Sequence, residues 1–287
     1  MDVLQKLGLV SFRAQPRNLS ASAIKDFSTA LILAAQRAPA VEMTLARAYE
    51  RGLMNEMIDL KSEVKQRFDI DGFVNFGRVV DDAELQALRV RIDEIGDGIV
   101  AVPAGCIRFQ EGWSAESSGG LSRREATWQL LDLHPHDDVV RAICETPLIR
   151  ETIEDFLEGP ARLWSDQVIM KPAHHGSVVP WHQDTSYWGQ EKRMTCWLAI
   201  DDATPANGCM RMIPGSHRRG QLEYTPRVFD GVDVHLLETN AVDPDTQIYV
   251  PVPAGCASFH HPLTLHASDV NSTAHSRRAL AITYQAV

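Results

Sequence analysis

ARLWSDQVIMK, residues 161–171, marks the point at which the character of this sequence changes. From here onward, short β-rich runs alternate with glycine and proline turns, and no helical segments come between them. Such spacing predicts an antiparallel β-sandwich or barrel. Residues 218–245 have no clear period and are expected to be a functional loop, such as a lid. The predicted strands cover residues 163–171, 195–200, 209–213, 247–252, 256–260 and 278–284.

The residues before this point are predicted to be mainly helical. Apolar side chains recur there at helical spacing between charged ones, and Pro147 is expected to break the last helix. Gly96 directly follows another helix, where a glycine can adopt the left-handed conformation that ends it. Residues 96–125 are rich in glycine and are expected to be mostly loop. The predicted elements are helices at residues 20–36, 41–68, 81–95 and 137–157 and short strands at residues 73–76 and 107–109.

These segments together predict an α+β chain that forms one continuous domain, residues 1–287. Its mainly helical part, residues 1–160, is expected to pack on a β core formed by residues 161–287. Hydrophobic residues make up 44% of the chain and charged residues 23%. Such a composition is ordinary for a folded protein, so disorder is excluded as the main state.

Charge and hydropathy exclude several kinds of partner. The chain has 28 basic and 38 acidic residues, a formal net charge of −10, so a nucleic-acid-binding surface is not expected. The longest strongly apolar run, residues 30–35, is far shorter than the roughly 20 residues of a membrane-spanning helix. No signal peptide is recognisable, and five scattered cysteines are typical of reduced thiols, so a cytoplasmic location is expected.

PWHQD, residues 180–184, carries the clearest chemical signal. In a strand, residues two apart point to the same side, so His182 and Asp184 can direct an imidazole and a carboxylate at one point. His266, at the start of the predicted last hairpin, is the expected third ligand. Two histidines and one carboxylate on one face of an octahedral ferrous ion leave positions open for a cosubstrate and dioxygen. An HxD pair by itself is weak, since it occurs by chance in many chains.

Arg277 strengthens this interpretation because it can supply a binding site for a carboxylate. Alternation along the predicted last strand places Arg277 on one face with Ala279 and Thr283, which leave room beside it. A guanidinium there can hold a carboxylate through two parallel hydrogen bonds. That geometry is needed to anchor a dicarboxylate whose other end chelates iron. Arg278 takes this place instead if the register is shifted by one residue.

With these residues the sequence resembles the phytanoyl-CoA dioxygenase family of iron(II)- and 2-oxoglutarate-dependent oxygenases. The resemblance runs from about residue 71 to residue 284, and its motifs occur in the family's order. They are Asp71-Gly72-Phe73-Val74, Asp82-Ala83-Glu84-Leu85, Lys171-Pro172, His182-Gln183-Asp184, residues 197–204, Asn207-Gly208-Cys209, residues 213–217, Ala254-Gly255, His266, Ser268, Asn271 and Arg277. The resemblance implies a double-stranded β-helix, a jelly-roll or cupin-like core, with an N-terminal helical layer packed on one sheet.

The resemblance also implies a metal site and an activity. His182, Asp184 and His266 are expected to bind iron(II). Arg277 is expected to pair with the distal carboxylate of the cosubstrate 2-oxoglutarate, and dioxygen is the second cosubstrate. The implied enzyme is a dioxygenase that hydroxylates or otherwise oxidises a C–H bond and releases succinate and carbon dioxide. Halogenating relatives lack the carboxylate that Asp184 provides, so hydroxylation or a related oxidation is expected.

Further contacts to the cosubstrate are implied by the same resemblance. Gln167, Trp197 and Ser268 stand where relatives contact 2-oxoglutarate. Gln129 lies near another such position, where some relatives have lysine. His217 is expected to lie in a turn. The other histidines near the motifs are expected to be structural or to support the ligands: His174, His175, His260 and His261.

The primary substrate is expected to be a small molecule, such as a natural-product or lipid-like intermediate of secondary metabolism. Tyr187 and Trp188, together with Phe109 and Trp113, are candidates for an apolar wall around it. Two alternatives remain open from the sequence. A cupin-like isomerase or hydrolase would use the three metal ligands with another divalent ion but would not need Arg277. A non-catalytic binding module would retain only the barrel. The sequence does not indicate the oligomeric state.

Overall fold

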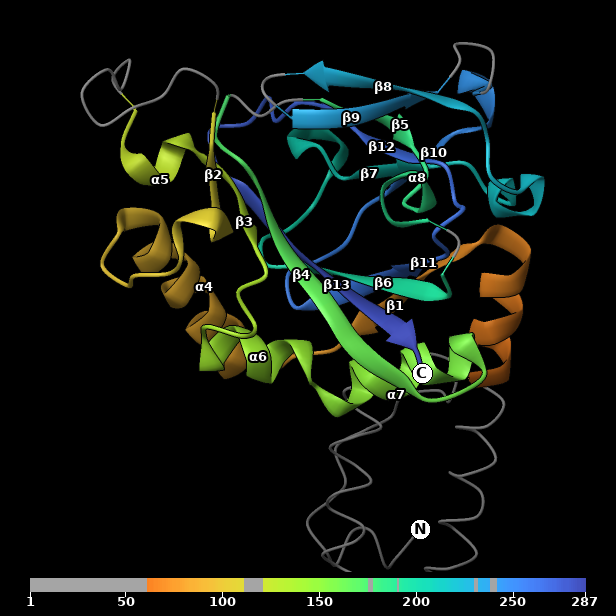
Figure 1. The fold of residues 1–287 in the computed structure, drawn as a ribbon, viewed down its shortest axis with the longest axis horizontal. Coiled ribbons are helices and arrows are strands. Elements are labelled where there is room, and N and C mark those ends of the chain that lie inside the picture. Colours follow the sequence, from red (N-terminus) through yellow and green to blue (C-terminus); the bar gives the residue numbers. More distant parts are fainter. Residues whose placement is uncertain (1–60, 111–120, 175–177, 190, 230–231, 238–241) are drawn as a thin grey trace, which may run out of the picture. The chain divides into compact units, whose positions relative to one another are not determined.

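Ala161–Lys171 (β4) and Arg277–Ala286 (β13) pair along their length at the centre of a seven-stranded sheet in the computed structural model (Figure 1). Every pair of neighbouring strands in this sheet is antiparallel. The strand order is β1 (Phe73–Arg78), β11 (Cys256–His260), β6 (Arg193–Ala199), β13, β4, β3 (Thr127–Leu131) and β2 (Ile107–Phe109). Strands from both halves of the chain therefore build one sheet.

A second sheet has four short antiparallel strands. Their order is β10 (Ile248–Val250), β7 (Met210–Met212), β12 (His266–Ser268) and β5 (Val179–His182). A separate two-stranded hairpin consists of β8 (Tyr224–Phe229) and β9 (Val232–Leu237). The two larger sheets form the predicted jelly-roll core of an α+β fold.

The structure describes residues 61–287 apart from residues 111–120, 175–177, 190, 230–231 and 238–241. All of these described residues belong to one compact unit, Glu56–Val287. The predicted helix at residues 20–36 and most of the one at residues 41–68 lie outside the described part, so a single domain of 287 residues stays a prediction. Within the described part, no helix combines the length and the apolar character needed to cross a membrane.

Helices pack on the large sheet and on one another. The helical segments are residues 61–71, α4 (Asp82–Asp97), α5 (Arg123–Ala126), α6 (Asp138–Cys144), α7 (Pro147–Leu157) and α8 (Thr185–Trp188), with 3₁₀ turns at Ala104–Cys106, Pro205–Asn207, Ser216–Arg219 and Pro244–Thr246. The α7 helix contacts β4, β6 and β13, while α4 packs against α5 and α6 (Figure 1). The predicted helical layer is therefore present on this sheet.

The α4 helix shows how local sequence sets a helix on the core. Asp81 begins it through a capping box, in which the Asp81 and Glu84 side chains each accept the other residue's amide N–H at 2.8 Å. Its buried apolar side chains recur at intervals of three and four: Leu85, Leu88, Ile92 and Ile95. Gly98 ends the helix in a left-handed conformation with φ 78°. The prediction that Gly96 ends the helix is two residues early, and Gly96 is buried within it.

Pro147 divides the helix predicted at residues 137–157 into α6 and α7, as expected. Pro147 lies in the first turn of α7, where its missing N–H removes no helical hydrogen bond. Asp137 begins α6 by accepting hydrogen bonds from the amides of Val139 and Val140, both at 3.0 Å. Asp137 therefore fixes where α6 begins, and Pro147 fixes where α7 begins after the break.

Two apolar clusters fill the fold. The larger one joins the helices to the large sheet and contains fully buried side chains such as Leu88, Ile153 and Phe259. The smaller one contains Trp197 and Met212, which come from strands of different sheets. Because its members come from both sheets, this second cluster holds the two sheets together beside the cavity described below.

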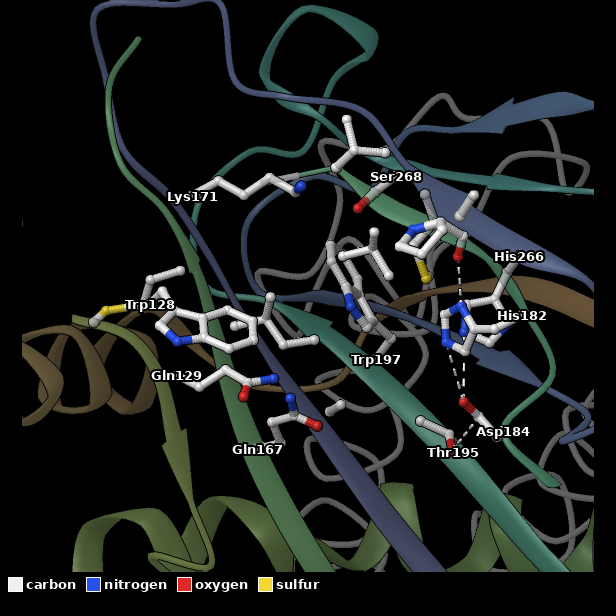
Figure 2. Close-up of a pocket in the computed structure, with 18 of the residues that line it drawn as sticks. Trp128, Gln129, Gln167, Lys171, His182, Asp184, Thr195, Trp197, His266 and Ser268 are labelled. Atoms are coloured by element: carbon white, nitrogen blue, oxygen red, sulfur yellow. Dashed lines mark hydrogen bonds and ion pairs between the residues drawn. The ribbon is translucent and has the colours of Figure 1, made fainter. Parts of the chain in front are cut away.

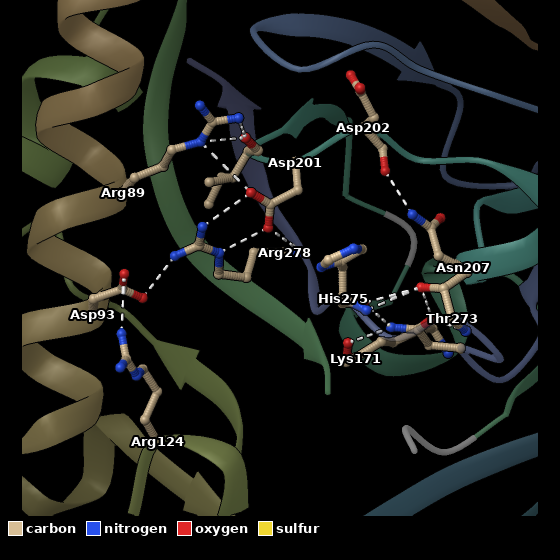
Figure 3. Close-up of polar contacts among 12 residues, drawn as sticks. Arg89, Asp93, Arg124, Lys171, Asp201, Asp202, Asn207, Thr273, His275 and Arg278 are labelled. Carbon is tan, nitrogen blue, oxygen red and sulfur yellow. Dashed lines mark hydrogen bonds and ion pairs between the residues drawn. The ribbon is translucent and has the colours of Figure 1, made fainter. Parts of the chain in front are cut away.

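Arg278 ties β13 to the helical layer through ion pairs (Figure 3). Its Nε and Nη2 atoms contact the two carboxylate oxygens of Asp201 at 2.8 and 2.9 Å, and its Nη1 contacts Asp93 of α4 at 2.7 Å. Arg89 of α4 also approaches Asp201, at 3.5 Å. The side chain of Arg278 therefore lies on the face of the sheet that packs against the helices. Because side chains alternate along a strand, Arg277 points to the opposite face, as the unshifted register predicts.

Residues 218–245 contain the hairpin of β8 and β9, where the sequence predicts an irregular loop. Pro226 lies inside β8, and its presence makes the sequence of this segment untypical of a strand, because the nitrogen of proline donates no hydrogen bond. In a two-stranded hairpin β8 has a free edge, so proline is tolerated there. The predicted last hairpin is also wrong, since β12 and β13 belong to different sheets.

Leu88 offers a test of how α4 packs on the core. Its side chain is fully buried, whereas Val90 of the same helix is 46% exposed. We expect Leu88→Ala to lower the free energy of unfolding by about 3 kcal/mol, because apolar burial is lost and a cavity is left. The matched control Val90→Ala should change it by less than about 0.5 kcal/mol. Urea denaturation measures both, and equal losses would contradict this packing.

Candidate active site

His182, Asp184 and His266 bring three potential metal-binding atoms within 4.8 Å of one another (Figure 2). The Nε2 atoms of His182 and His266 lie 3.7 and 3.5 Å from Oδ1 of Asp184, and the two ring centroids are 4.0 Å apart. Strand pairing brings the histidines together, since His266 of β12 lies opposite His182 of β5. The three predicted ligands therefore converge on one point.

Hydrogen bonds to the backbone orient both imidazoles. Nδ1 of His182 lies 2.9 Å from the carbonyl oxygen of Pro180, and Nδ1 of His266 lies 2.9 Å from that of Thr264. A carbonyl oxygen only accepts, so each Nδ1 carries the proton and donates it. Each Nε2 consequently turns its lone pair toward the other ligands, which is the tautomer that a metal ion requires.

Asp184 reaches the triad through a turn of the chain. The β5 strand ends at His182, and Asp184 has helical backbone angles, φ −58° and ψ −34°, just before α8. The prediction that alternation within a strand aligns these two side chains is therefore wrong, although both reach the same point. Gln183 holds the turn, since its Nε2 donates to the carbonyl oxygens of Gly220 at 2.9 Å and Leu263 at 2.8 Å.

Two residues of the large sheet hold the carboxylate of Asp184. Nε2 of His260 lies 3.1 Å from Oδ2 of Asp184, and the hydroxyl of Thr195 donates to the same oxygen at 3.3 Å. His260 of β11 and Thr195 of β6 are paired neighbours. They leave Oδ1 directed at the other two ligands. His260 has the supporting position that the sequence predicted, but Thr195 was missed because a threonine in a strand carries no signal of its own.

Burial and neighbouring groups keep the triad in the form that binds a cation. Burial lowers the pKa of His182, and burial together with the nearby His182 lowers the pKa of His266 to about 3. Burial acts to raise the pKa of Asp184, but the surrounding imidazoles, that of His266 first, outweigh burial and hold this pKa below its usual range. At neutral pH the site therefore presents two neutral imidazoles and a carboxylate, as metal binding requires.

Arg277 lies in the wall of the same cavity with hydrogen-bond donors unused. Its side chain is 1% exposed, and its Nη2 donates to the carbonyl oxygen of Gly208 at 2.8 Å. Its Nε and Nη1 atoms have no hydrogen-bond partner among the described residues. Its guanidinium carbon lies 5.4 Å from the ring centroid of Trp197. A buried guanidinium in this state is costly until an acceptor binds it, so the position fits a carboxylate.

A cavity of about 840 Å³ joins the triad to Arg277. Every residue predicted to contact the cosubstrate lines it: Gln129, Gln167, Trp197, Ser268 and Arg277. In Figure 2, Trp197 and Ser268 lie between Lys171 and the two histidine ligands, while Gln129 and Gln167 lie near Trp128. The structure thus gathers all predicted site residues around one space, although they come from both sheets.

Lys171 is a second buried cation of this wall, to which the sequence assigned no role in the site. It is 2% exposed and lies opposite Arg277 in the pairing of β4 with β13. Its side chain passes over Gly208, where a Cβ atom would lie 2.9 Å from Cδ of Lys171 and 2.4 Å from the carbonyl oxygen of Asp269. Only glycine fits there. Burial and then the charge of Arg277 lower the pKa of Lys171 to about 7.

The other histidines lie outside the triad. His261 contacts His217, with ring centroids 5.4 Å apart, and neither of them lines the cavity. His174 lines the cavity but is exposed. His175 lies outside the described residues. None of these three histidines belongs to a candidate metal group among the described residues, and their structural role stays a prediction.

Asp132, His134 and Asp166 form a second group with potential metal-binding atoms. The carboxylate of Asp166 accepts hydrogen bonds from the amides of Leu133 at 3.1 Å and His134 at 2.9 Å, and it lies 2.7 Å from Nδ1 of His134. These contacts occupy the oxygens that a metal ion would use. We therefore interpret this group as the support of a turn.

A jelly roll that holds such a triad beside an arginine prepared for a carboxylate belongs to the class of non-haem iron oxygenases that use a 2-oxo acid. Residues 68–279 match the family described as phytanoyl-CoA dioxygenase (PhyH), which is more than half of the chain. The chain belongs to this family, as its motifs predicted. It is an iron(II)- and 2-oxoglutarate-dependent dioxygenase.

Known proteins similar to this chain span most of its length. L-proline trans-4-hydroxylase of Streptomyces griseoviridis is 29% identical over 251 residues, which cover 78% of this chain and 86% of that protein. Methylphosphonate hydroxylase of Gimesia maris is 29% identical over 227 residues, covering 77% and 79%. The solved structure of EvdO2 from Micromonospora carbonacea var. aurantiaca, complexed with 2-oxoglutarate, has a TM-score of 0.62 at 21% identity and covers 78% of this chain and 90% of that one. This structural likeness shows the shared fold.

The lowered pKa of Lys171 predicts how stability varies with pH. Between about pH 7 and 10.5 the unfolded chain holds a proton on Lys171 that the folded protein releases. The buried Lys171 therefore lowers the free energy of unfolding most at or below pH 7, and this destabilisation disappears as the pH rises to 10.5. We expect Lys171→Met to raise the free energy of unfolding relative to wild type. This increase should be larger at pH 7 than at pH 10 by more than about 1 kcal/mol.

Chemical denaturation of the metal-free proteins at both pH values measures this gain. Lys192→Met is the matched control, because Lys192 is exposed and its removal relieves no buried charge. A difference between Lys171→Met and wild type that is the same at pH 7 and pH 10 would contradict the prediction.

Proposed function

We propose that this enzyme hydroxylates, or otherwise oxidises, a C–H bond of a small organic substrate in the cavity between the sheets. In this proposal His182, Asp184 and His266 hold iron(II), and Arg277 binds the distal carboxylate of 2-oxoglutarate. The observation that carries the proposal is the buried guanidinium of Arg277, whose Nε and Nη1 atoms lack partners among the described residues in the cavity that the triad lines.

Bound iron(II) and 2-oxoglutarate supply the oxidising power for the C–H bond, with release of succinate and carbon dioxide. The residues of the chain position these groups. The Nδ1–H bonds hold both imidazoles, and His260 and Thr195 hold the carboxylate of Asp184, so the ligand set is organised before it is filled. Trp197 packs beside the guanidinium of Arg277.

The cavity wall supports a small, partly apolar substrate. Trp128, Tyr187 and Trp188 line it, whereas Phe109 does not and Trp113 lies outside the described residues. The relatives named above are hydroxylases of L-proline and methylphosphonate, which are small molecules. These observations support a substrate of natural-product or lipid-like size. A role in secondary metabolism and a cytoplasmic location stay predictions.

Anaerobic titration with iron(II) and then 2-oxoglutarate tests the proposal. We expect wild type to develop a metal-to-ligand absorption band in the green. Arg277→Ala should raise the Kd for 2-oxoglutarate about 30-fold or more, because a buried charge pair is lost, and should leave iron(II) affinity unchanged. Arg162→Ala, which changes an exposed arginine of β4, should behave as wild type.

Two outcomes would favour other functions. Absence of the band in wild type would favour a non-catalytic binding module. Equal affinity of wild type and Arg277→Ala for 2-oxoglutarate would favour a cupin-like isomerase or hydrolase, which needs the metal ligands but no arginine site.

A further inference from the structure

The cavity wall carries more positive than negative charge, although the chain has a formal net charge of −10. Among the described residues that line the cavity, the cationic side chains are Arg108, Lys171 and Arg277, and Asp184 is the one acid. Iron(II) and 2-oxoglutarate carry opposite double charges, so binding both of them leaves this excess in place. A cavity lined in this way attracts an anion as its next ligand.

Arg108 lies at the β2 edge of the large sheet, away from Arg277. The row of paired residues runs from Arg108 through Gln129 of β3 and Ile169 of β4 to β13. Three strand spacings of about 4.8 Å put the backbone of Arg108 roughly 14 Å from β13. Arg277 is also fixed to the carbonyl oxygen of Gly208, so Arg108 at this separation is placed to bind an anion other than the carboxylate assigned to Arg277.

Arg108 is exposed, and its contacts differ from those of three half-buried arginines near the two sheets. Arg89, Arg211 and Arg278 each meet an aspartate within 3.5 Å. Arg108 meets no carboxylate among the described residues, and its Nη1 donates to Oε1 of the neutral Gln129 at 3.2 Å. This bond orients the guanidinium and leaves the edge formed by Nε and Nη2 for an oxyanion.

The wall between Arg108 and the centre of the large sheet is neutral. Leu131, Gln167 and Ile169 line it from β3 and β4, and Trp128 adds an aromatic surface. Such a wall is complementary to a molecule with an anionic group at the β2 end and an uncharged body toward the triad. Burial of that body on the apolar side chains adds to its binding.

We propose that the primary substrate carries a carboxylate or phosphonate group and that Arg108 binds this group at the β2 edge of the cavity. This inference rests on the oxygenase function proposed above and names its substrate class. The group is held by parallel hydrogen bonds from Nε and Nη2 of Arg108. Gln129, which the sequence placed near the cosubstrate, acts here as a positioning residue that holds the guanidinium for the substrate.

Matched pairs of compounds test the substrate class. Amino acids, 2-hydroxy acids, medium-chain fatty acids and alkylphosphonates are each paired with their neutral amides or esters, and succinate formation is measured with product mass. We expect acids to raise succinate formation at least tenfold above the substrate-free rate, and their neutral partners to leave it unchanged. Equal activity on both members of the pairs, activity on neutral members alone, or no active acid would overturn the proposal.

Variants of Arg108 test the binding site with the best acid from that panel. Arg108→Gln should raise its KM about 30-fold or more, because a charge-assisted pair is lost, and should change kcat less than threefold. Arg108→Lys should recover part of this loss. Gln129→Glu, which sets a competing carboxylate beside the guanidinium, should also raise KM. Arg150→Gln, an exposed arginine on α7, should match wild type. An unchanged KM in Arg108→Gln would overturn the proposal.

The absorption band separates failure of this inference from failure of the proposed function. Arg108→Gln should form the band with iron(II) and 2-oxoglutarate at wild-type concentrations, because Arg108 serves the substrate alone. A band in wild type together with an unchanged KM in Arg108→Gln overturns the anion site only. Absence of the band in wild type overturns the proposed oxygenase function, and with it the basis of the anion site.

Discussion

The pairing of β12 with β5 is the constraint on which the rest of the site depends. It sets His266 opposite His182, while β7 pairs with the other edge of β12 and holds it inside its sheet. A slip of one residue would turn one imidazole to the opposite face of the sheet. Asp184 then needs only the turn after β5, and its carboxylate is held by Thr195 and His260 of the facing sheet. The candidate metal site is therefore built across both sheets, and its geometry requires that they stay packed together.

Two neighbouring arginines of β13 differ in whether the fold itself satisfies their charge. Arg278 is paired with Asp201 and Asp93, so its charge is satisfied within the fold and joins the sheet to α4. Arg277 is more deeply buried and has two donor atoms without partners among the described residues. Such a group lowers the stability of the empty protein and favours the state in which an anion is bound. In the function proposed above, the carboxylate of the cosubstrate offsets this cost in stability.

Much of the fold followed from periodicity, and its failures have local causes. The break at Pro147 and the strands around residues 163–171 and 278–284 were predicted correctly, because proline and alternation act within a few residues. The hairpin at β8 and β9 was missed because residues 218–245 show no clear period. Pro226 adds to this, since proline is unfavourable in a strand that has partners on both sides. The end of α4 was set two residues early because two glycines compete there, and only Gly98 takes the left-handed conformation.

The sequence by itself determined which residue types are present and in what order: the HxD motif, the distant His266, and an arginine on the last strand. It determined the family as well, because those motifs are specific when they occur together. Only the tertiary structure decided that Asp184 arrives by a turn, that Thr195 and His260 hold it, and that Lys171 and Arg108 share the cavity with Arg277. These features depend on contacts between strands far apart in the chain, and such contacts leave no periodic trace along it.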